Sequence, residues 1–288
     1  MKRRRARRLE AGRTSLTARW VGLARGLGAG RLPPDPTVPW LLGGLAGRLA
    51  LAGRRTPLGT LLRWGSLGLV DHVVLRTEAI DRRLGRLLEE TGSGQLVVLG
   101  AGFDGRAWRL PCLRNVSVYE VDHPATAASK RDRAAERPPL AASVRFVAVD
   151  FERDELGPRL LEAGYDPTGP SVWLWEGVTM YLATGAVEAT LRHVASLTSP
   201  GSHLMLTYAA PPLVAPWPRL DPVVRVALAA LGEPLRSVLP PEHMHALLAD
   251  AGFTVREDSD EPRWGQEVGQ PSRPLPIART ERLLHAER

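Results

Sequence analysis

Residues 95–111, QLVVLGAGFDGRAWRLP, decide the fold of this 288-residue chain. An apolar run of strand length, QLVVL, ends in a loop where Gly100, Gly102 and Gly105 spell GxGxxG. Such glycines let a chain turn sharply from a strand into a helix, and the backbone NH groups at the start of that helix can face a ligand. The stretch therefore predicts the first strand of a sheet that binds a nucleotide-like cofactor beyond its carboxyl edge.

The periodicity of apolar residues changes across this loop. Upstream, residues 14–90 read as helices, and between Val70 and Leu87 apolar side chains recur every three or four positions. Downstream come six further strand-like runs: VSVYEVD, VRFVAVD, SVWLWEG, SHLMLTY, FTVREDSD and IARTERLLHAE. Strands that alternate with helices favour a parallel sheet covered on both faces. We expect an α/β, Rossmann-like fold with a seven-stranded sheet, helices on both faces and a helical cap before it.

The same pattern divides the chain into regions. A basic arm occupies residues 1–13, an N-terminal helical cap residues 14–92, and a cofactor-binding core residues 93–288. A proline-rich insertion at about 209–240 follows the fifth strand and is too long for a plain turn. Insertions at such an edge often cover a binding site, so we expect it to form a substrate lid.

Composition indicates a globular protein. Hydrophobic residues make up 44% and charged residues 24% of the chain, and no apolar run reaches the length of roughly 18 residues that a membrane span needs. The basic start is followed by no apolar segment, so it does not resemble a secretory signal. A single cysteine, Cys112, excludes a disulfide framework and fits a reducing compartment. We therefore expect a cytoplasmic protein without a membrane span.

The net charge of +7 is unevenly distributed. Residues 1–63 hold fourteen Lys or Arg against two acids, a net charge of +12, which leaves −5 for the remainder. A nucleic-acid enzyme more often carries its basic surface beside the active cleft. Because the excess lies in the N-terminal region, we expect no nucleic-acid partner.

Carboxylates follow consecutive strands at the predicted carboxyl edge. Asp122 ends the second strand, twenty residues after Gly102, where an acid typically binds a ribose diol. Asp150 and Phe151 end the third strand and could contact an adenine, and Glu176 ends the fourth. Ligands bind outside the carboxyl ends of parallel strands, so these side chains are expected to share one site.

Dinucleotides and S-adenosylmethionine (SAM) both suit such an edge, and three features favour SAM. Asp104 lies inside the glycine loop, where it would repel a pyrophosphate, and SAM has no phosphate. Asp150 could accept a hydrogen bond from the amino group of an adenine, and Phe151 could pack against its ring. Glu176 is placed to meet an ammonium or sulfonium cation, as in SAM.

Four strings resemble those of a known family. LGAGFDGRAWRLP, VYEVDHP, VAVDFERDEL and WLWEGVTMYL are similar to the motifs of the leucine carboxyl methyltransferase type of class I SAM-dependent methyltransferases, which includes bacterial O-methyltransferases of natural-product pathways. The upstream string DHVVLRTEAID resembles the arginine helix of that family, and the resemblance covers nearly the whole chain. Gly105 stands where the family usually has threonine, and Trp108 where it commonly has tyrosine.

The resemblance implies SAM as cofactor and gives roles to single residues. Arg76 would pair with the methionyl carboxylate, and the backbone of Gly100, Ala101 and Gly102 would pack on the methionyl part. Asp122 would hold the ribose, Asp150 and Phe151 the adenine, and Glu176 the amino group. An arginine for a carboxylate and an acid for an ammonium match both ends of a zwitterion. From the residues alone, a helix-surface ion pair between Arg76 and Asp81 is the alternative.

The sequence does not identify a catalytic group. His72, four residues before Arg76 on one helix face, is a candidate base. Tyr181 after the fourth strand and Tyr208 at the end of the fifth are further catalytic candidates, because both could line the methyl-transfer pocket. Trp217 in the insertion is the candidate for substrate contact, whereas Trp173 and Trp175 alternate on a buried strand and are expected in the core. His243 and His245 do not share a helix face, and no metal site is expected.

These observations predict a SAM-dependent O-methyltransferase acting on a small molecule in bacterial secondary metabolism. A carboxylate acceptor is preferred over a hydroxyl, because a carboxylate needs no general base. Three alternatives stay open: a SAM-binding fold used for a non-methylating cyclisation or rearrangement, an NAD-dependent oxidoreductase, and a non-catalytic module that binds through the arginine arm. The acceptor and the oligomeric state are not indicated.

Overall fold

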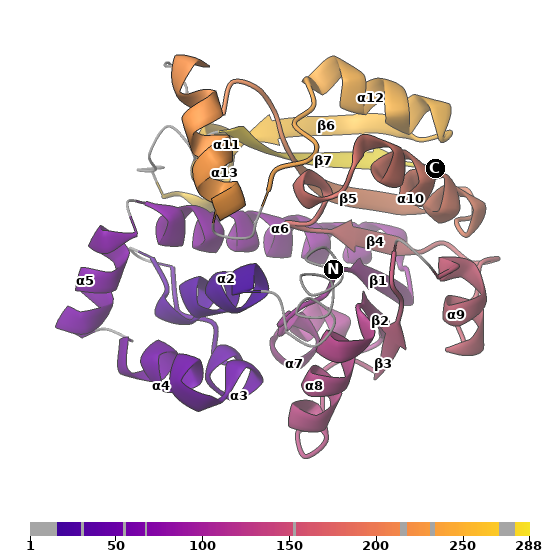
Figure 1. The fold of residues 1–288 in the computed structure, drawn as a ribbon. Helices are drawn as coiled ribbons and strands as arrows, with labels where there is room; N and C mark the ends of the chain where they lie inside the picture. Colours follow the sequence, from indigo (N-terminus) through magenta and orange to yellow (C-terminus); the bar gives the residue numbers. More distant parts are fainter. Residues whose placement is uncertain are drawn as a thin grey trace, which may run out of the picture.

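The structure is a computed structural model that describes residues 16–29, 32–53, 56–66, 68–151, 154–213, 218–230, 234–270 and 280–288. Its centre is a seven-stranded sheet in the order β3-β2-β1-β4-β5-β7-β6. The strands are β1 (Gln95–Leu99), β2 (Ser117–Asp122), β3 (Ser143–Ala148), β4 (Val172–Trp175), β5 (His203–Ala209), β6 (Thr254–Asp260) and β7 (Glu281–Glu287). The predicted α/β class and the seven strands are confirmed (Figure 1).

One strand departs from the expected parallel arrangement. β7 pairs antiparallel with both β5 and β6, while β3, β2, β1, β4 and β5 pair in parallel. The last strand therefore runs between β5 and β6 in the opposite direction and brings its first residue, Glu281, to the carboxyl edge of the parallel strands. The strand-by-strand reading of the sequence did not indicate this reversal.

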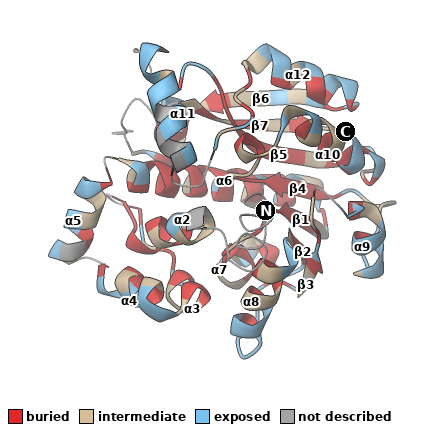
Figure 2. Cartoon of the chain, viewed as in Figure 1, coloured by how far each residue is buried: buried red, intermediate tan, exposed pale blue. Residues whose placement is uncertain are grey.

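Alternating side chains of the buried strands build two hydrophobic cores. Val97 and Leu99 of β1 face one core, and Leu96 and Val98 face the other. The first core is closed by α9 (Leu156–Glu162), α10 (Thr184–Ser196) and α12 (Pro241–Asp250), and the second by α2 (Leu16–Leu27), α6 (Leu69–Thr91) and α13 (Glu261–Val268). The sheet is thus covered on both faces, as the apolar strands require (Figure 2). Trp173 and Trp175 are fully buried, as predicted.

The N-terminal helices form a cap beside the sheet. It comprises α2, α3 (Val38–Leu42), α4 (Gly44–Gly53), α5 (Pro57–Gly65) and the start of α6, and α4 and α5 lie at one end of the molecule (Figure 1). α6 matches the predicted amphipathic helix: Val70, Val73, Ile80 and Leu84 on its apolar stripe are buried. The described helices include none long and apolar enough to cross a membrane.

The connections after the parallel strands carry the remaining elements. α7 (Arg106–Arg109) and η1 (Pro111–Leu113) follow β1, α8 (Pro124–Ala134) follows β2, and η2 (Thr179–Tyr181) follows β4. The insertion after β5 holds η3 (Pro218–Leu220) and α11 (Asp221–Ala230). Leu213 in this insertion packs with Met180 of η2, and Leu235 and Val238 pack against the pair. The insertion therefore contacts the segment that follows β4.

Candidate functional site

A cavity of about 360 Å³ lies beyond the carboxyl ends of β1, β2, β3 and β4. Its lining includes every residue that the sequence assigned to the cofactor: Arg76, Gly100, Ala101, Gly102, Asp122, Asp150, Phe151 and Glu176. The cap contributes Ala18, Val21 and Arg25 of α2, and η2 contributes Tyr181. Residues spread over more than 150 positions of the sequence thus face a single space.

The glycine loop is shaped by close approaches of its backbone. Gly100 has φ +66°, and a Cβ there would lie 2.5 Å from Cγ2 of Val178. The NH of Gly102 donates to Asp122 Oδ2 at 2.5 Å, and the NH of His123 donates to Asp122 Oδ1 at 2.6 Å. These two bonds fix the carboxylate of Asp122 in the wall of the cavity, and each oxygen keeps a further lone pair for a ligand hydroxyl.

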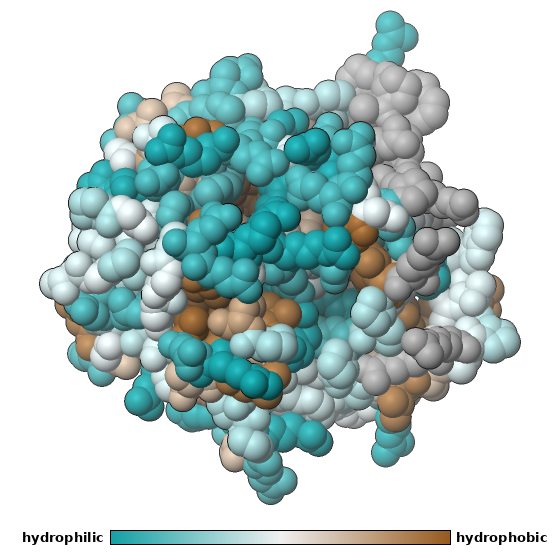
Figure 3. All heavy atoms as spheres, turned by 180° about the vertical axis from the view of Figure 1, so that it is seen from behind, coloured by the Kyte–Doolittle hydropathy of each residue, from teal (hydrophilic) through white to brown (hydrophobic). Residues whose placement is uncertain are grey.

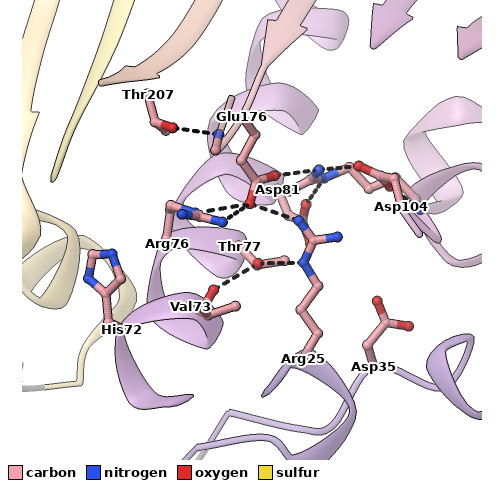
Figure 4. A network of polar contacts seen from close by, with 12 residues as sticks. Arg25, Asp35, His72, Val73, Arg76, Thr77, Asp81, Asp104, Glu176 and Thr207 are labelled. Carbon is pink, nitrogen blue, oxygen red and sulfur yellow. Dashed lines mark hydrogen bonds and ion pairs between the residues drawn. The ribbon is translucent and has the colours of Figure 1, made fainter. Parts of the chain in front are cut away.

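Glu176 lies at the centre of a buried group of arginines (Figure 4). Its Oε1 accepts from Arg25 Nη2 at 2.8 Å and from Arg76 Nε at 3.0 Å, and its Oε2 pairs with Arg106 Nη1 at 2.8 Å. Burial alone would raise the pKa of Glu176, but Arg25, Arg106 and Arg76 outweigh it and hold that pKa well below its usual value. Arg25 also donates to Thr77 Oγ1 at 3.2 Å, which ties α2 to α6.

Arg76 and His72 share a carboxylate on the last strand. Arg76 Nη1 donates to Glu281 Oε2 at 2.8 Å, and His72 Nε2 lies 2.7 Å from the same oxygen. His72 Nδ1 lies 2.8 Å from Glu261 Oε2. Arg76 is therefore a buried cavity residue held by Glu176, which follows β4, and by Glu281 of β7, and the alternative of a surface pair with Asp81 is wrong.

A second set of ion pairs joins the glycine loop to the cap. Arg106 pairs with Asp104 and, at 2.5 Å, with Asp81 Oδ1 of α6. Arg109 pairs with Asp81 Oδ2 at 2.6 Å and with Asp35 Oδ2 at 3.0 Å. Asp104 is 3% exposed, does not line the cavity and has its charge balanced by Arg106. The sequence argument that Asp104 would repel a pyrophosphate is therefore wrong, because Asp104 is paired with Arg106 and lies outside the cavity lining.

Gly105 is matched to a threonine of the cap. A Cβ at position 105 would lie 1.8 Å from Thr37 Oγ1 and 2.7 Å from Thr37 Cβ. Thr37 is buried and donates from Oγ1 to Asp35 Oδ1 at 2.6 Å. Position 105 is glycine here, where the family usually has threonine. The missing side chain leaves the space in which Thr37 packs.

The candidate catalytic residues differ in whether they line the cavity. Tyr181 lines the cavity. Tyr208 is 1% exposed and donates to Asp258 Oδ2 at 2.6 Å, away from the cavity lining, and burial raises its pKa. His72 is likewise outside the lining, with both ring nitrogens against carboxylates, which argues against its role as a base. Trp217 lies outside the described residues.

Sequence reasoning missed three residues of the site. Arg25 lines the cavity, and Arg106 and Glu281 hold Glu176 and Arg76. Arg106 was visible as part of the FDGRAWR string, yet its partner Glu176 is 70 positions away in the sequence. Nothing in the local pattern of Arg25 or Glu281 distinguishes either from a surface charge. Among the described residues, no group of three or more His, Cys, Asp or Glu could hold a metal ion.

Comparison with known proteins identifies the family. The sequence profile of the leucine carboxyl methyltransferase family matches residues 35–195, more than half of the chain. The chain belongs to this family. A protein of Mycobacterium marinum named "Putative S-adenosyl-L-methionine-dependent methyltransferase" is 38% identical over 174 residues, 59% of this chain and 52% of that protein. A similarly named protein of Frankia alni is 36% identical over 174 residues, 57% of this chain and 59% of that protein. The chain spans about half the length of these relatives.

Solved structures agree on the fold of this leucine carboxyl methyltransferase family member. A duf574 family protein from Streptomyces avermitilis superposes with a TM-score of 0.63 over 96% of this chain and 98% of that one, at 13% identity. A "putative methyltransferase" from Thermobifida fusca superposes with a TM-score of 0.60 over 93% and 94% of the chains, at 18% identity. The fold is therefore that of class I SAM-dependent methyltransferases.

Proposed function

We propose that this protein is a SAM-dependent methyltransferase that methylates a small molecule at oxygen. SAM would occupy the cavity beyond β1 to β4, with Asp122 on the ribose and Asp150 and Phe151 at the adenine. Arg76 would meet the methionyl carboxylate and Glu176 the ammonium, beside the backbone of Gly100, Ala101 and Gly102. Family membership supports the reaction class, and the gathering of these residues in one cavity supports the assignment.

The charge of the cavity is the observation that carries the proposal. Two arginines, Arg25 and Arg76, and three carboxylates, Asp122, Asp150 and Glu176, line it. With His123 counted as neutral, the lining carries one net negative charge. SAM carries one net positive charge, from its ammonium and sulfonium against one carboxylate, whereas NAD is net negative. Charge complementarity therefore favours SAM over a dinucleotide.

Methyl transfer from SAM requires little of the protein beyond alignment of the methyl donor with the acceptor. When bound, SAM supplies an electrophilic methyl group that is displaced in line by the acceptor. Glu176 and Arg76 are fixed by buried ion pairs, so they would orient the methionyl end without reorganising. His123, the histidine of the cavity lining, accepts from the NH of Ala125 through Nδ1 as a helix cap, so this nitrogen is not available as a general base. This supports a carboxylate acceptor over a hydroxyl.

The elements around the cavity suggest where the acceptor binds. We assign acceptor contacts to the helical cap, residues 14–92, and to the insertion at about 209–240, which contacts η2 beside Tyr181. Trp217 stays a candidate contact in that insertion. A cytoplasmic enzyme of bacterial secondary metabolism is the setting that we propose, from the single cysteine and from the family resemblance.

Calorimetric titration with SAM, S-adenosylhomocysteine and NAD tests the cofactor. We expect both sulfur ligands to bind and NAD to give no response. Asp122→Asn should weaken SAM binding at least tenfold, which corresponds to about 1.4 kcal/mol. Asp132→Asn, on the exposed side of α8, is the matched control and should leave the affinity unchanged.

Mass spectrometry with SAM then tests the reaction on panels of small carboxylic acids and phenols. A product heavier by one CH2 unit from carboxylic acids is the expected result. Methylation of phenols alone would overturn the carboxylate preference, and binding of NAD alone would overturn the proposed function.

A further inference from the structure

The cap exposes a set of large apolar side chains at the end of the molecule farthest from α9. Leu45 (73% exposed) and Leu51 (58%) lie on α4, and Leu61 (69%) and Trp64 (79%) lie on α5. We call these four residues the α4–α5 patch. Figure 2 shows exposed positions along both helices, and Figure 3 shows, from behind, that apolar atoms reach the molecular surface in several places among polar ones. None of the four lines the cofactor cavity.

The patch follows the helical repeat on both helices. Three exposed positions on α4 are spaced three residues apart: Leu45, Arg48 and Leu51. On α5 the exposed Pro57 is followed after four residues by Leu61 and after seven by Trp64. Residues at such spacings lie on one face of a helix. α4 and α5 contact each other, so their exposed stripes belong to neighbouring elements. Large exposed apolar side chains that cluster on neighbouring elements often mark a contact site.

The charge around the patch is positive. Among the described residues from 16 to 66 the acidic side chain is Asp35, which is buried and paired with Arg109. Arg48 is exposed within the α4 stripe, and Arg63 is half-buried beside Asp71 of α6. In the sequence, seven basic residues against one acid precede α2. The described part of residues 16–66 therefore offers apolar groups and cationic groups without an exposed acid.

We propose that the α4–α5 patch docks on an anionic lipid surface. Leucine and tryptophan on one face with arginine nearby is the combination that binds the interface of acidic membranes, where the apolar side chains enter the headgroup region and the cations pair with phosphates. A second copy of the chain is disfavoured as occupant, because it would bring two segments of net charge +12 together. Nucleic acid is disfavoured because the exposed leucines would gain nothing from it. The proposal does not depend on the proposed function.

Sedimentation of the full chain with vesicles tests this proposal. We expect binding to vesicles that mix phosphatidylglycerol with phosphatidylcholine, weakening as salt rises, and no binding to phosphatidylcholine alone. The double variant Leu61→Ser/Trp64→Ser should bind the anionic vesicles at least tenfold more weakly. Leu161→Ser, at a 49% exposed position on α9, is the matched control and should bind like the wild type. SAM titration of each variant, or circular dichroism if SAM does not bind, checks that it is folded.

Three outcomes would overturn the proposal. Equal binding to vesicles with and without phosphatidylglycerol would show that the contact does not require an anionic lipid. Undiminished binding of the double variant would assign the contact to the basic residues before α2. A dimer in light scattering that Leu61→Ser/Trp64→Ser dissociates, without vesicle binding, would assign the patch to a second copy of the chain.

Discussion

At the scale of single residues, His72 lies between two buried carboxylates of different elements. Burial alone would lower its pKa, but Glu261 and Glu281 outweigh burial and raise it to about 9. The folded protein therefore holds the proton more tightly than the unfolded chain, whose histidine has a pKa near 6.5. This contribution to stability is complete below pH 6.5 and is lost as pH rises to about 9.

We therefore predict that the free energy of unfolding falls between pH 7 and pH 9 by roughly 1 kcal/mol for each pH unit. Urea unfolding at several pH values measures this slope. Glu120, with a pKa raised to about 7 by burial, and His285, with a pKa lowered to about 4, titrate at or below the start of this window. His72→Gln should flatten the slope, and exposed His193→Gln should not. A slope that persists in His72→Gln would exclude His72 as its origin.

The contact between Gly105 and Thr37 gives a second prediction at this scale. Gly105→Ala should lower the free energy of unfolding by about 1–3 kcal/mol, because the new Cβ overlaps Thr37 Oγ1 in a buried place. Backbone strain is not involved, since φ of Gly105 is −109°. Chemical denaturation of Gly105→Ala, Thr37→Ala and the double variant measures the coupling.

In the double variant we expect part of the loss to be recovered, because the hydroxyl that meets the new methyl is gone. Gly94→Ala is the comparison: a Cβ at that position meets nothing within 4 Å. Additive losses in the double variant would show that the two positions do not compete for the same space.

At the scale of elements, Arg25 connects helix α2 to the core through Glu176 and Thr77. Arg25→Met should loosen α2 while the sheet stays intact, because Glu176 keeps Arg76 and Arg106 as partners. Hydrogen exchange of the α2 amides should become about tenfold faster, and that of β1 should not change. Arg19→Met, on the same helix and half-buried, is the control. Equal acceleration in both variants would assign the effect to helix propensity.

The elements were largely predictable because their signals are local. The run QLVVL and the helical stripe from Val70 to Leu87 each specify their own structure through periodicity, and α6 (Leu69–Thr91) and β1 (Gln95–Leu99) match them closely. The direction of β7 was not predictable, because antiparallel insertion between β5 and β6 is decided by pairing across the sheet. The cavity residues after the strands followed from topology, whereas the partners of Glu176 depend on tertiary contacts that no local pattern records.

At the scale of the whole molecule, two hydrophobic cores share one sheet, and buried ion pairs link the cap to it. Both cores contain side chains of β1, β2, β4 and β5, so neither can unfold without exposing the other. Arg109 extends the coupling to Asp35 in the cap. The described residues therefore form one cooperative unit, and thermal unfolding should show a single transition in both far-UV and near-UV circular dichroism.

A ligand that fits the cavity should shift this transition as a whole. Binding to the native state adds a free energy of RT ln(1 + [L]/Kd), about 2.7 kcal/mol at a hundredfold excess over Kd. S-adenosylhomocysteine at that concentration should raise Tm by about 5 °C, and NAD should leave it unchanged. Asp122→Asn, compared with its own ligand-free midpoint, should show about half that rise or less at the same ligand concentration, because Asp122 lines the cavity beside the glycine loop. A full rise in Asp122→Asn would mean that the ligand binds elsewhere, and a rise confined to a separate transition of the cap would contradict the single cooperative unit.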